Sequence, residues 1–548
     1  MAKLLLEARD VSKAYGLRPV LACLNFDLYD GERVGLVGEN GAGKSTFLHI
    51  LAGDLLPDDG LITRRAPVSL ISQFGDAAEV SLDPALGSEF AAPPAREGLS
   101  GGEKTRRRIA GALSGKSQVL LADEPTTDLD AAGIQRLEKH LRAYPGALVL
   151  ISHDRALLDG VCTRIVELED GKLTSFPGNY SAYRQEKQRR RSFQQFKYEQ
   201  YRAEEKRIRT MIQRETELAS QKTGMPKRMG NSEARLHKRE DTVVQGKIHQ
   251  VRKMFESRLG RLEEVERPRE DPAIAMRLGA ATPVTSRTAL EIRGISLRVG
   301  ARFLLENASM RLPTGTRTAL LGENGCGKTT LMHRITAFRQ NPAVRVSPGV
   351  KIGWFDQDHA ATLNPEATAL ENALAESVVP ESTVRTILAR LNLRGDDVFK
   401  PLKVLSGGEK AKVALASLFA RDINLLILDE PTNHLDVYTL EALTEVLKSY
   451  AGTVLVASHD RTFVSETANR LVFFENKSLT TFEGSWPEWE KARRRDRTRE
   501  DMQLEITRLQ MRLAVLTSRM SAPKKGDSPE KLNAEYQQVL SQLNALRT

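Results

Sequence analysis

The sequence predicts an α/β fold of two tandem domains, joined by a long antiparallel α-helical hairpin and followed by a C-terminal α-helical hairpin. Three observations predict this arrangement. The chain repeats its own motifs in order. Short apolar runs alternate with helical patterns in each copy. Two charged stretches, one between the copies and one after them, carry apolar residues at every third or fourth position.

A tandem duplication is visible in the order and spacing of the motifs. GENGAGKST at 38–46 recurs as GENGCGKTT at 322–330, and LSGGEK at 99–104 recurs at 405–410. The first pair is offset by 284 residues and the second by 306, so the second copy carries 22 extra residues between its two motifs. The matching stretch of the first copy, 74–98, contains Ala-Ala-Pro-Pro and predicts little regular structure.

Apolar runs in the first copy predict a mostly parallel sheet. Val34–Val37 leads into a glycine-rich loop, and the helical pattern Thr46–Leu51 follows that loop. Val119–Leu121 and Leu148–Ile151 are short apolar runs typical of strands that are buried on both faces. Such strands belong to sheets covered by helices on both sides.

The stretch between the copies predicts a hairpin of two helices. Gln, Glu, Lys and Arg dominate residues 181–219, and a second helical pattern covers 232–266, with glycine and proline between them. The tip, 221–230, holds three cations and no acid. Helices of this length extend roughly 50–60 Å. The apolar seam consists of Tyr201, Ile208, Ile212, Leu218, Val244, Ile248, Val251, Phe255, Leu259 and Leu262.

The C-terminal stretch predicts a second, shorter hairpin. The basic run Lys491–Arg499 precedes it, and residues 521–528, which include a proline and a glycine, separate its two helices. One seam consists of Ile506, Leu509, Leu513, Leu516 and Met520, and the other of Leu532, Tyr536, Val539, Leu543 and Leu546. We therefore expect four segments: α/β domains at 4–180 and 286–490, a linker at 181–285 with its tip at about 221–230, and an extension at 491–548.

The positive charge of the chain lies outside the two repeats. The 548 residues include 81 basic and 71 acidic side chains, a net charge of +10. Residues 181–270 hold 24 basic and 14 acidic side chains, and residues 491–548 hold 13 and 7. The remaining 44 basic and 50 acidic side chains give the rest of the chain a net charge of −6. This placement predicts a polyanionic partner for the linker and the tail.

Composition argues against several classes of protein. No stretch of 18 apolar residues is present, so no transmembrane helix is expected. The apolar run Leu4–Leu6 is too short for the core of a signal peptide. Cys23, Cys162 and Cys326 lie far apart and match neither a metal site nor a disulfide framework. A reduced, cytoplasmic location is expected.

The two GxxxxGK[ST] motifs predict phosphate-binding loops. Their glycines let successive backbone N–H groups point at phosphate oxygens, and the following helix directs the positive end of its dipole to the same place. Each lysine is expected to reach the β- and γ-phosphates, and each Ser or Thr after it to offer a hydroxyl to Mg²⁺. The predicted nucleotide-binding residues of these loops are Gly38, Asn40, Gly41, Gly43, Lys44, Ser45 and Thr46, and Gly322, Asn324, Gly325, Gly327, Lys328, Thr329 and Thr330.

Acidic residues at the ends of two apolar runs are the predicted catalytic groups. VLLADE at 119–124 and LLILDE at 425–430 both end in Asp-Glu. The aspartate suits the metal shell, and the glutamate suits a base that polarises the attacking water. A histidine in each SHD motif is the predicted γ-phosphate contact. The catalytic prediction is Glu124, Glu430, His153 and His459, and the metal prediction is Ser45, Gln73, Asp123, Thr329, Gln357 and Asp429.

The LSGGE motif, with these other motifs in the same order in both copies, resembles the signature of ATP-binding-cassette (ABC) ATPases over about residues 4–190 and 288–490. The resemblance implies that each copy is an ABC-type P-loop ATPase domain whose signature closes over the nucleotide held by the other copy. It implies two composite sites for ATP and Mg²⁺. The first joins Lys44, Gln73, Asp123, Glu124 and His153 to Ser406, Gly407 and Gly408. The second joins Lys328, Gln357, Asp429, Glu430 and His459 to Ser100, Gly101 and Gly102.

Two cassettes in one chain, a charged linker of about 90 residues and no membrane segment resemble the ABC-F family. This resemblance implies binding to the bacterial 70S ribosome, with the linker in the E site, directed at the P-site tRNA and the peptidyl transferase centre of the 23S rRNA. The long tip, the C-terminal extension and the short Gln73–Leu99 spacing are similar to antibiotic-resistance ribosome-protection proteins of the Vga, Lsa and VmlR group. A monomer with intramolecular pairing of its cassettes is expected.

The sequence departs from the family pattern at two places. Tyr15 stands where the family stacks an aromatic ring on adenine, but its counterpart is Val299, for which the nearby Phe303 is a candidate substitute. The family's NHLD at 433–436 is TDLD at 127–130 in the first copy, so the two sites are expected to hydrolyse ATP at different rates. Both glutamates are present, so two competent sites are predicted.

The tip of the linker is the predicted RNA contact. Lys222, Lys227 and Arg228 would contact phosphates, and Met225 and Met229 would pack against bases, so that binding weakens with salt. A charged spacer is the alternative for this segment.

Three other functions remain open for the whole chain. One is a housekeeping translation factor that relieves stalled ribosomes, and another is the ATPase subunit of a membrane transporter. The linker, its basic tip and the tail argue against the transporter. A DNA-repair or chromosome-structure ATPase is the third, and such proteins have much longer coiled coils or zinc-binding cysteines.

Overall fold

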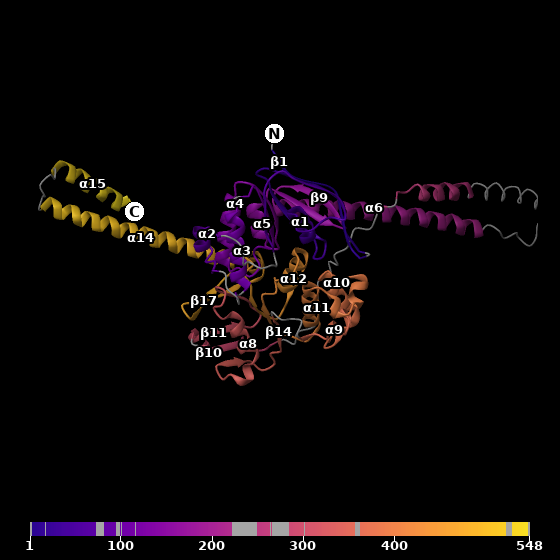
Figure 1. Ribbon diagram of the computed structural model, residues 1–548. Helices are drawn as coiled ribbons and strands as arrows, with labels where there is room; N and C mark the ends of the chain where they lie inside the picture. The colour runs from indigo at the N-terminus through magenta and orange to yellow at the C-terminus, as the bar shows by residue number, and fades with distance from the viewer. Residues whose placement is uncertain are drawn as a thin grey trace, which may run out of the picture.

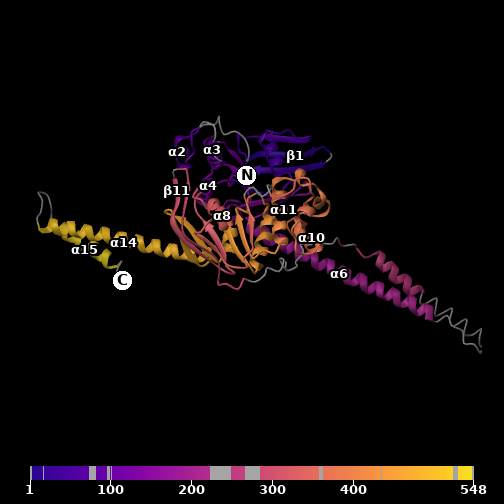
Figure 2. The ribbon, with the colours of Figure 1, turned by 90° about the horizontal axis from the view of Figure 1, so that it is seen from below.

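Two α/β domains lie against each other, and two helical arms leave this body on opposite sides (Figures 1 and 2). One arm is the linker, which begins with α6 (Tyr180–Gln221), and the other is the tail, which begins with α14 (Trp486–Ser521). The computed structural model describes residues 3–16, 18–72, 82–94, 99, 101–115, 117–221, 249–263, 265, 284–300, 302–356, 362–433, 435–521 and 529–545. No helix in these ranges is both long and apolar enough to cross a bilayer.

The first domain contains a six-stranded sheet in the order β5-β6-β7-β3-β8-β9, in which only β9 pairs antiparallel. A three-stranded antiparallel sheet, β2-β1-β4, packs beside it. Every residue of β6 and β7 is buried, which confirms the two predicted buried strands. The strands are β1 (Leu4–Tyr15), β2 (Arg18–Tyr29), β3 (Arg33–Val37), β4 (Asp59–Arg64), β5 (Val68–Ile71), β6 (Val119–Asp123), β7 (Ala147–Ile151), β8 (Arg164–Glu169) and β9 (Lys172–Pro177). The helices are α1 (Lys44–Ala52), α2 (Pro84–Glu89), α3 (Gly101–Ser114), α4 (Ala131–Ala143) and α5 (Arg155–Val161).

The second domain repeats this topology, with sheets β14-β15-β16-β12-β17-β18 and β11-β10-β13. The tandem α/β prediction is therefore confirmed. The strands are β10 (Thr288–Val299), β11 (Arg302–Pro313), β12 (Arg317–Leu321), β13 (Val344–Val346), β14 (Ile352–Phe355), β15 (Leu425–Asp429), β16 (Thr453–Ala457), β17 (Arg470–Glu475) and β18 (Ser478–Glu483). The α-helices are α8 (Lys328–Thr336), α9 (Ala369–Leu374), α10 (Glu381–Arg390), α11 (Gly407–Ala420), α12 (Val437–Ser449) and α13 (Arg461–Thr467). Short 3₁₀ helices lie at η1 (Phe338–Gln340), η3 (Gly395–Phe399) and η4 (Leu402–Val404).

The two copies differ between the sheet and the signature helix. The extra length of the second copy lies in a helical region that includes α9 and α10, where Val384, Ile387 and Leu388 are buried. In the first copy, the prediction of little regular structure for 74–98 is wrong in part, because α2 forms there. Asp83 caps α2 by accepting a hydrogen bond from the Ala85 N–H (2.9 Å), and Pro84 occupies the first helical position.

The linker is a helical hairpin in its described part. Helix 249–260 lies beside α6, and Arg258 Nη2 is 2.9 Å from Glu204 Oε1 across the two helices. Ile208 of the predicted seam is buried, whereas Val251 is exposed. The second helix was predicted to end near residue 266, but it ends at Gly260, since glycine ends helices readily. The tip from residue 222 onward lies outside the described residues.

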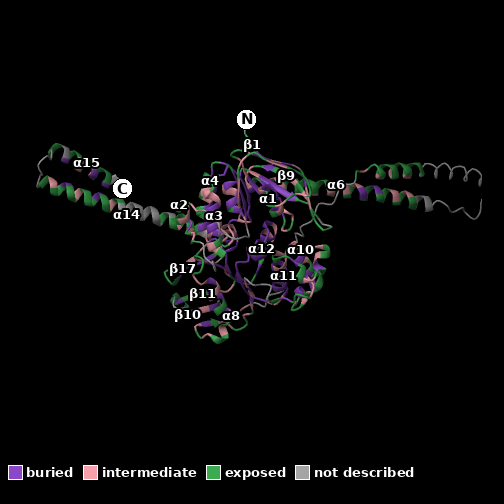
Figure 3. Cartoon of the chain, viewed as in Figure 1, coloured by how far each residue is buried: buried purple, intermediate pink, exposed green. Residues whose placement is uncertain are grey.

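The tail is also a hairpin, in which α15 (Pro529–Ala545) packs on α14. The buried residues between them are Leu509, Leu516, Leu532, Val539 and Leu543, all from the two predicted seams. Met520 of the first seam is exposed instead, because it lies in the last turn of α14, next to the connection. Leu546 lies outside the described residues. Figure 3 contrasts these largely exposed arms with the buried interior of the two α/β domains.

A buried ion pair joins two helices of the second domain. Lys412 Nζ on α11 is 2.7 Å from Asp436 Oδ2, which also caps α12 by accepting from the Thr439 N–H. Burial disfavours ionisation of Asp436, but the Lys412 ammonium outweighs burial and lowers the pKa of this carboxyl to about 2. The pair therefore remains charged at neutral pH and holds the signature helix α11 to the start of α12.

Replacing Lys412 with Met is expected to lower the free energy of unfolding by about 3–5 kcal/mol, because Asp436 is left as a buried charge without its cation. Urea denaturation of the full chain measures this change. The control is Lys448→Met, since Lys448 pairs with Glu445 at the surface, where a pair contributes at most about 1 kcal/mol. Equal, small effects of the two changes would contradict the buried-pair account.

Candidate nucleotide-binding and ATPase sites

Both phosphate loops hold their lysines in the same way. Lys44 opens α1 and is buried, and its Nζ donates to the carbonyls of Gly38 and Glu39 at 2.9 Å each. Gly43, just before it, has a φ of 100°, and a Cβ there would lie 2.4 Å from Val20 Cγ1. Only glycine fits this position. In the second copy, Lys328 Nζ donates to the carbonyls of Gly322 and Glu323 at 2.9 and 3.2 Å.

The predicted catalytic glutamates follow directly after the parallel strands β6 and β15. Glu124 and Glu430 both adopt a φ of 46°, in the left-handed region. Their backbone N–H groups donate to the carbonyls of Ile151 and Ala457, at 3.0 and 2.9 Å, on the neighbouring strands β7 and β16. A non-glycine residue in this conformation costs energy, so the strands hold it in place. Both glutamates line the same cavity as Lys44 and Lys328.

Each glutamate contacts the predicted histidine. The backbone N–H of His153 donates to Glu124 Oε2 at 3.3 Å, and its Nε2 lies 3.3 Å from Glu124 Oε1. The equivalent distances for His459 and Glu430 are 3.3 and 3.4 Å.

Burial raises the pKa of the Glu124 carboxyl to about 8, against the opposing effect of Lys44. Burial likewise raises the pKa of the Glu430 carboxyl to about 7.

His459 is a neutral imidazole. Burial, and after it the charge of Lys328, lower its pKa to about 4. Its Nε2 lies 3.1 Å from Lys328 Nζ, so this nitrogen accepts a hydrogen bond from the ammonium. The histidine, the lysine and Glu430 thus form one group around the place where a γ-phosphate would lie.

The donor set for a divalent cation fits Mg²⁺. Asp123 and Asp429 are almost fully buried, and burial raises the pKa of both carboxyls. One oxygen of Asp123 is buried without a hydrogen-bond partner among the described residues, and the Asp429 carboxylate has the Thr329 hydroxyl beside it. A hard cation with phosphate and water oxygens would satisfy them. Gln73 and Gln357, the other predicted ligands, lie outside the described residues.

Residues of both copies line one cavity of about 1780 Å³. Both phosphate-loop lysines, Gly101 and Gly102 of the first signature, and Ser406, Gly407 and Gly408 of the second are among them. Across the domain junction, Asn324 Nδ2 donates to the carbonyl of Asp128 at 2.9 Å. The predicted residues that line the cavity are Tyr15, Asn40, Gly41, Gly43, Lys44, Ser45, Thr46, Gly101, Gly102, Asp123, Glu124, His153, Asn324, Gly325, Gly327, Lys328, Thr329, Thr330, Ser406, Gly407, Gly408, Asp429, Glu430 and His459.

Some parts of the cavity differ from the sequence expectation. Val299 lines it, but Phe303 does not appear among its described lining residues and instead borders a second cavity. Phe303 is therefore not placed to substitute for Tyr15. Arg106 and Arg302 also line the nucleotide cavity. Sequence reasoning missed both, although Arg106 follows Gly102 by one helical turn and could have been found from that spacing. Ser100 lies outside the described residues, as does His434 of the second NHLD motif.

Comparisons with known proteins identify the family of the chain. A family model described as "ABC transporter" matches residues 21–82 and 305–433, and a second with the same description matches 166–276. The chain is 33% identical to the ribosome protection protein VmlR of Bacillus subtilis, over 83% of this chain and 84% of that one. The chain belongs to the ABC-F family.

Other ABC-F relatives have similar coverage. The erythromycin resistance ATP-binding protein MsrA of Staphylococcus epidermidis is 33% identical, over 82% of this chain and 94% of that one. The energy-dependent translational throttle protein EttA of Mycobacterium tuberculosis is 31% identical, over 87% and 92%. Among solved structures, one titled "RNase-L Inhibitor" aligns with a TM-score of 0.58 at 19% identity, over 87% of this chain and 90% of that one. The likeness to that structure concerns the fold of two tandem ABC domains.

The pH dependence of ATP hydrolysis is expected to differ between the two sites. A glutamate must be ionised to take a proton from water, so the rate rises about tenfold per pH unit below its pKa and levels off above it. Glu430→Gln leaves Glu124, with a midpoint near pH 8, and Glu124→Gln leaves Glu430, with a midpoint near pH 7. Phosphate release between pH 5.5 and 9.5 (roughly the range that spans both midpoints) is the measurement, with ATP binding followed as the control. Identical midpoints, or rates that fall with rising pH, would contradict the assignment of Glu124 and Glu430 as the two bases.

Proposed function

We propose that this ABC-F protein binds the bacterial 70S ribosome in its ATP-bound state, inserts its linker into the E site toward the P-site tRNA and the peptidyl transferase centre, and protects the ribosome from antibiotics. Hydrolysis of ATP at two composite sites then releases it. The observation that carries the proposal is one cavity that both phosphate loops and residues of both signatures line. The names of VmlR and MsrA support the protective role.

In the proposed reaction, Lys44 and Lys328 bind the γ-phosphate, and the N–H groups at the starts of α11 and α3 donate to it from the opposite cassette. Glu124 and Glu430 accept the proton of the attacking water. Bound Mg²⁺ would neutralise charge on the β- and γ-phosphates, and Asp123, Asp429, Ser45 and Thr329, together with Gln73 and Gln357, are the residues that would hold it. Because the signature contacts need the γ-phosphate, hydrolysis would weaken the junction of the cassettes.

The proposed RNA contact is the linker tip, through Lys222, Met225, Lys227, Arg228 and Met229. Its support is the charge of the segment 181–270, whose 24 basic and 14 acidic side chains contrast with a net negative remainder of the chain. The domain limits that we propose are those predicted from the sequence, 4–180, 181–285, 286–490 and 491–548. We also propose that the protein is a cytoplasmic monomer.

A housekeeping translation factor is the second candidate, because EttA matches over a similar share of the chain. Both candidates share the ribosome as partner and differ only in whether an antibiotic is displaced. Both matching family models are described as "ABC transporter", but none of the three relatives named above is named as a transporter ATPase.

Changing both Glu124 and Glu430 to Gln is expected to hold the protein on 70S ribosomes in the presence of ATP, since the nucleotide would bind but not be cleaved. Sedimentation through a sucrose cushion measures the bound fraction, with ADP as the nucleotide control. Lys44→Ala together with Lys328→Ala, which removes phosphate binding, is the matched variant and should remain in the supernatant. A doubly Gln-substituted protein that stays free of ribosomes with ATP would remove the ribosome from the proposal.

Expression in a susceptible bacterium is expected to raise inhibitory concentrations for at least one drug of the peptidyl transferase region. The panel is lincosamides, pleuromutilins, streptogramin A and phenicols, with erythromycin added because MsrA carries that name. The tip variant Lys222→Glu, Lys227→Glu, Arg228→Glu should lose the protection while retaining ribosome-free ATP hydrolysis, because reversed charges repel RNA phosphates.

Two results of this test would redirect the proposal. No shift with any drug would favour the housekeeping factor. Full protection by the tip variant would make the tip a spacer.

A further inference from the structure

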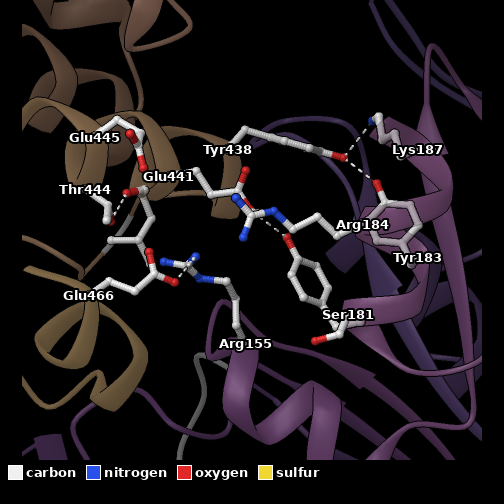
Figure 4. A network of polar contacts seen from close by, with 12 residues as sticks. Arg155, Ser181, Tyr183, Arg184, Lys187, Tyr438, Glu441, Thr444, Glu445 and Glu466 are labelled. Carbon is white, nitrogen blue, oxygen red and sulfur yellow. Dashed lines mark hydrogen bonds and ion pairs between the residues drawn. The ribbon is translucent and has the colours of Figure 1, made fainter. Parts of the chain in front are cut away.

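A buried polar cluster ties the base of the linker to the opposite cassette. Glu167 lies on β8 of the first domain, Tyr183 and Lys187 lie on α6, and Tyr438 lies on α12 of the second domain. Tyr438 Oη donates to Glu167 Oε1 at 2.5 Å, and Tyr183 Oη donates to the same oxygen at 2.7 Å. Lys187 Nζ contacts Glu167 and donates to Tyr438 Oη at 3.0 Å. Figure 4 shows the two tyrosines and Lys187 converging.

The cluster is complete only when both domains contribute to it. Glu167 and Tyr183 are buried, and burial opposes ionisation of this carboxyl. The hydrogen bonds from Lys187, Tyr183 and Tyr438 outweigh burial, and they hold the pKa of Glu167 below its ordinary value. The carboxylate is therefore a buried charge, one of whose three donors comes from the opposite cassette. Loss of that donor leaves a buried charge less well satisfied.

Further contacts join the same surfaces. Arg184 Nε on α6 is 3.2 Å from Glu441 Oε1 on α12, and Tyr180 Oη is 3.4 Å from that oxygen. Beside them, Arg155 Nη1 on α5 is 3.5 Å from Glu466 Oε1 on α13. The first turns of the linker helix thus contact the second domain as well as their own.

The start of α12 connects this cluster to the first nucleotide site. Asp436 is paired with Lys412 on α11, the helix whose first residues line the nucleotide cavity together with Lys44. The next residue, Val437, is buried in the hydrophobic core of the first domain. Tyr438 follows it. Asp436, Val437 and Tyr438 therefore connect the signature helix α11, the core of the first domain and the base of the linker in three successive residues.

The duplication supplies an internal comparison. One repeat later in sequence, Glu167, Tyr183 and Lys187 correspond to Phe473, Trp489 and Arg493 at the base of the tail, and the counterpart of Tyr438 is Ala132. Ala132 and the other three of these counterparts line a cavity of about 1310 Å³. The rings of Phe473 and Trp489 stack at 4.8 Å. At the base of the linker, the Tyr438 hydroxyl thus joins α6 and β8 to the opposite cassette. The equivalent residues at the base of the tail border a cavity instead.

We propose that Tyr438 is a positioning residue that transmits the ATP-dependent pairing of the cassettes to the linker helix α6. When the signature helix α11 engages the nucleotide at Lys44, α12 moves with it, and its tyrosine completes the Glu167 cluster and orients the linker. This inference rests on the proposed function for its purpose, but its test needs no ribosome.

The test is hydrogen exchange of the α6 amides at 184–200, with and without ATP, in the full chain carrying Glu124→Gln and Glu430→Gln. ATP is expected to slow exchange about tenfold, the size expected for one hydrogen bond to a charged acceptor. Adding Tyr438→Phe, which removes only the hydroxyl, should abolish this difference. In the otherwise unchanged protein, Tyr438→Phe should leave ribosome-free hydrolysis within about twofold, since this hydroxyl does not line the nucleotide cavity.

Tyr450→Phe is the matched control. Its hydroxyl is also buried, but it donates to the carbonyl of Ile423 within the second domain, at 2.6 Å. This variant should keep the effect of ATP on α6. Should Tyr438→Phe fail to fold, Lys187→Met tests the same cluster from its exposed edge. Exchange in α6 that responds equally to ATP with and without the Tyr438 hydroxyl would overturn the inference, whatever the protein does on ribosomes.

Discussion

Val437 of the second cassette is buried in the core of the first domain, so this one side chain packs the two cassettes together. The residue before it, Asp436, pairs with Lys412 of the signature helix α11, whose first residues line the nucleotide cavity together with Lys44. The hydrogen bond from Asn324 to the carbonyl of Asp128 makes the matching contact at the second loop. Both phosphate-loop lysines and residues of both signatures line the cavity at this junction, so the composite sites that we propose depend on it.

The chemistry of the site follows from burial at the ends of parallel strands. β6 and β15 deliver Asp-Glu pairs into a space that is partly closed by the partner cassette, and burial there raises the pKa of both glutamates. A base of this kind is best matched to proton transfer when its pKa lies near the working pH. The neutral state of His459 has the same origin, since a cation beside Lys328 would be doubly unfavourable.

Much of this architecture could be predicted from the sequence, because it depends on short-range spacing. The phosphate loops, the Asp-Glu strand ends and the seams of the tail all have signals within a few residues. Helix α2 escaped prediction, since its cap at Asp83 gives a weak signal beside the Ala-Ala-Pro-Pro stretch. The joint of Tyr438 with Glu167 was missed for a different reason, because 271 residues separate the partners and neither lies in a motif. Contacts of this range require the three-dimensional fold.

The duplication also explains why two equivalent halves need not act alike. The copies share motifs, but the joint at the base of the linker carries a carboxylate and two tyrosines, whereas that of the tail carries stacked aromatic rings beside a cavity. The response to nucleotide that we propose for the Tyr438 hydroxyl would therefore concern the linker and not the tail.

A reconstruction by electron cryo-microscopy of the Glu124→Gln, Glu430→Gln protein with ATP and 70S ribosomes tests the central claim most directly. The account predicts two ATP molecules, each between a phosphate loop and the opposite signature, with the linker inside the E site. Nucleotides held by separated cassettes, or a linker outside the ribosome, would contradict it.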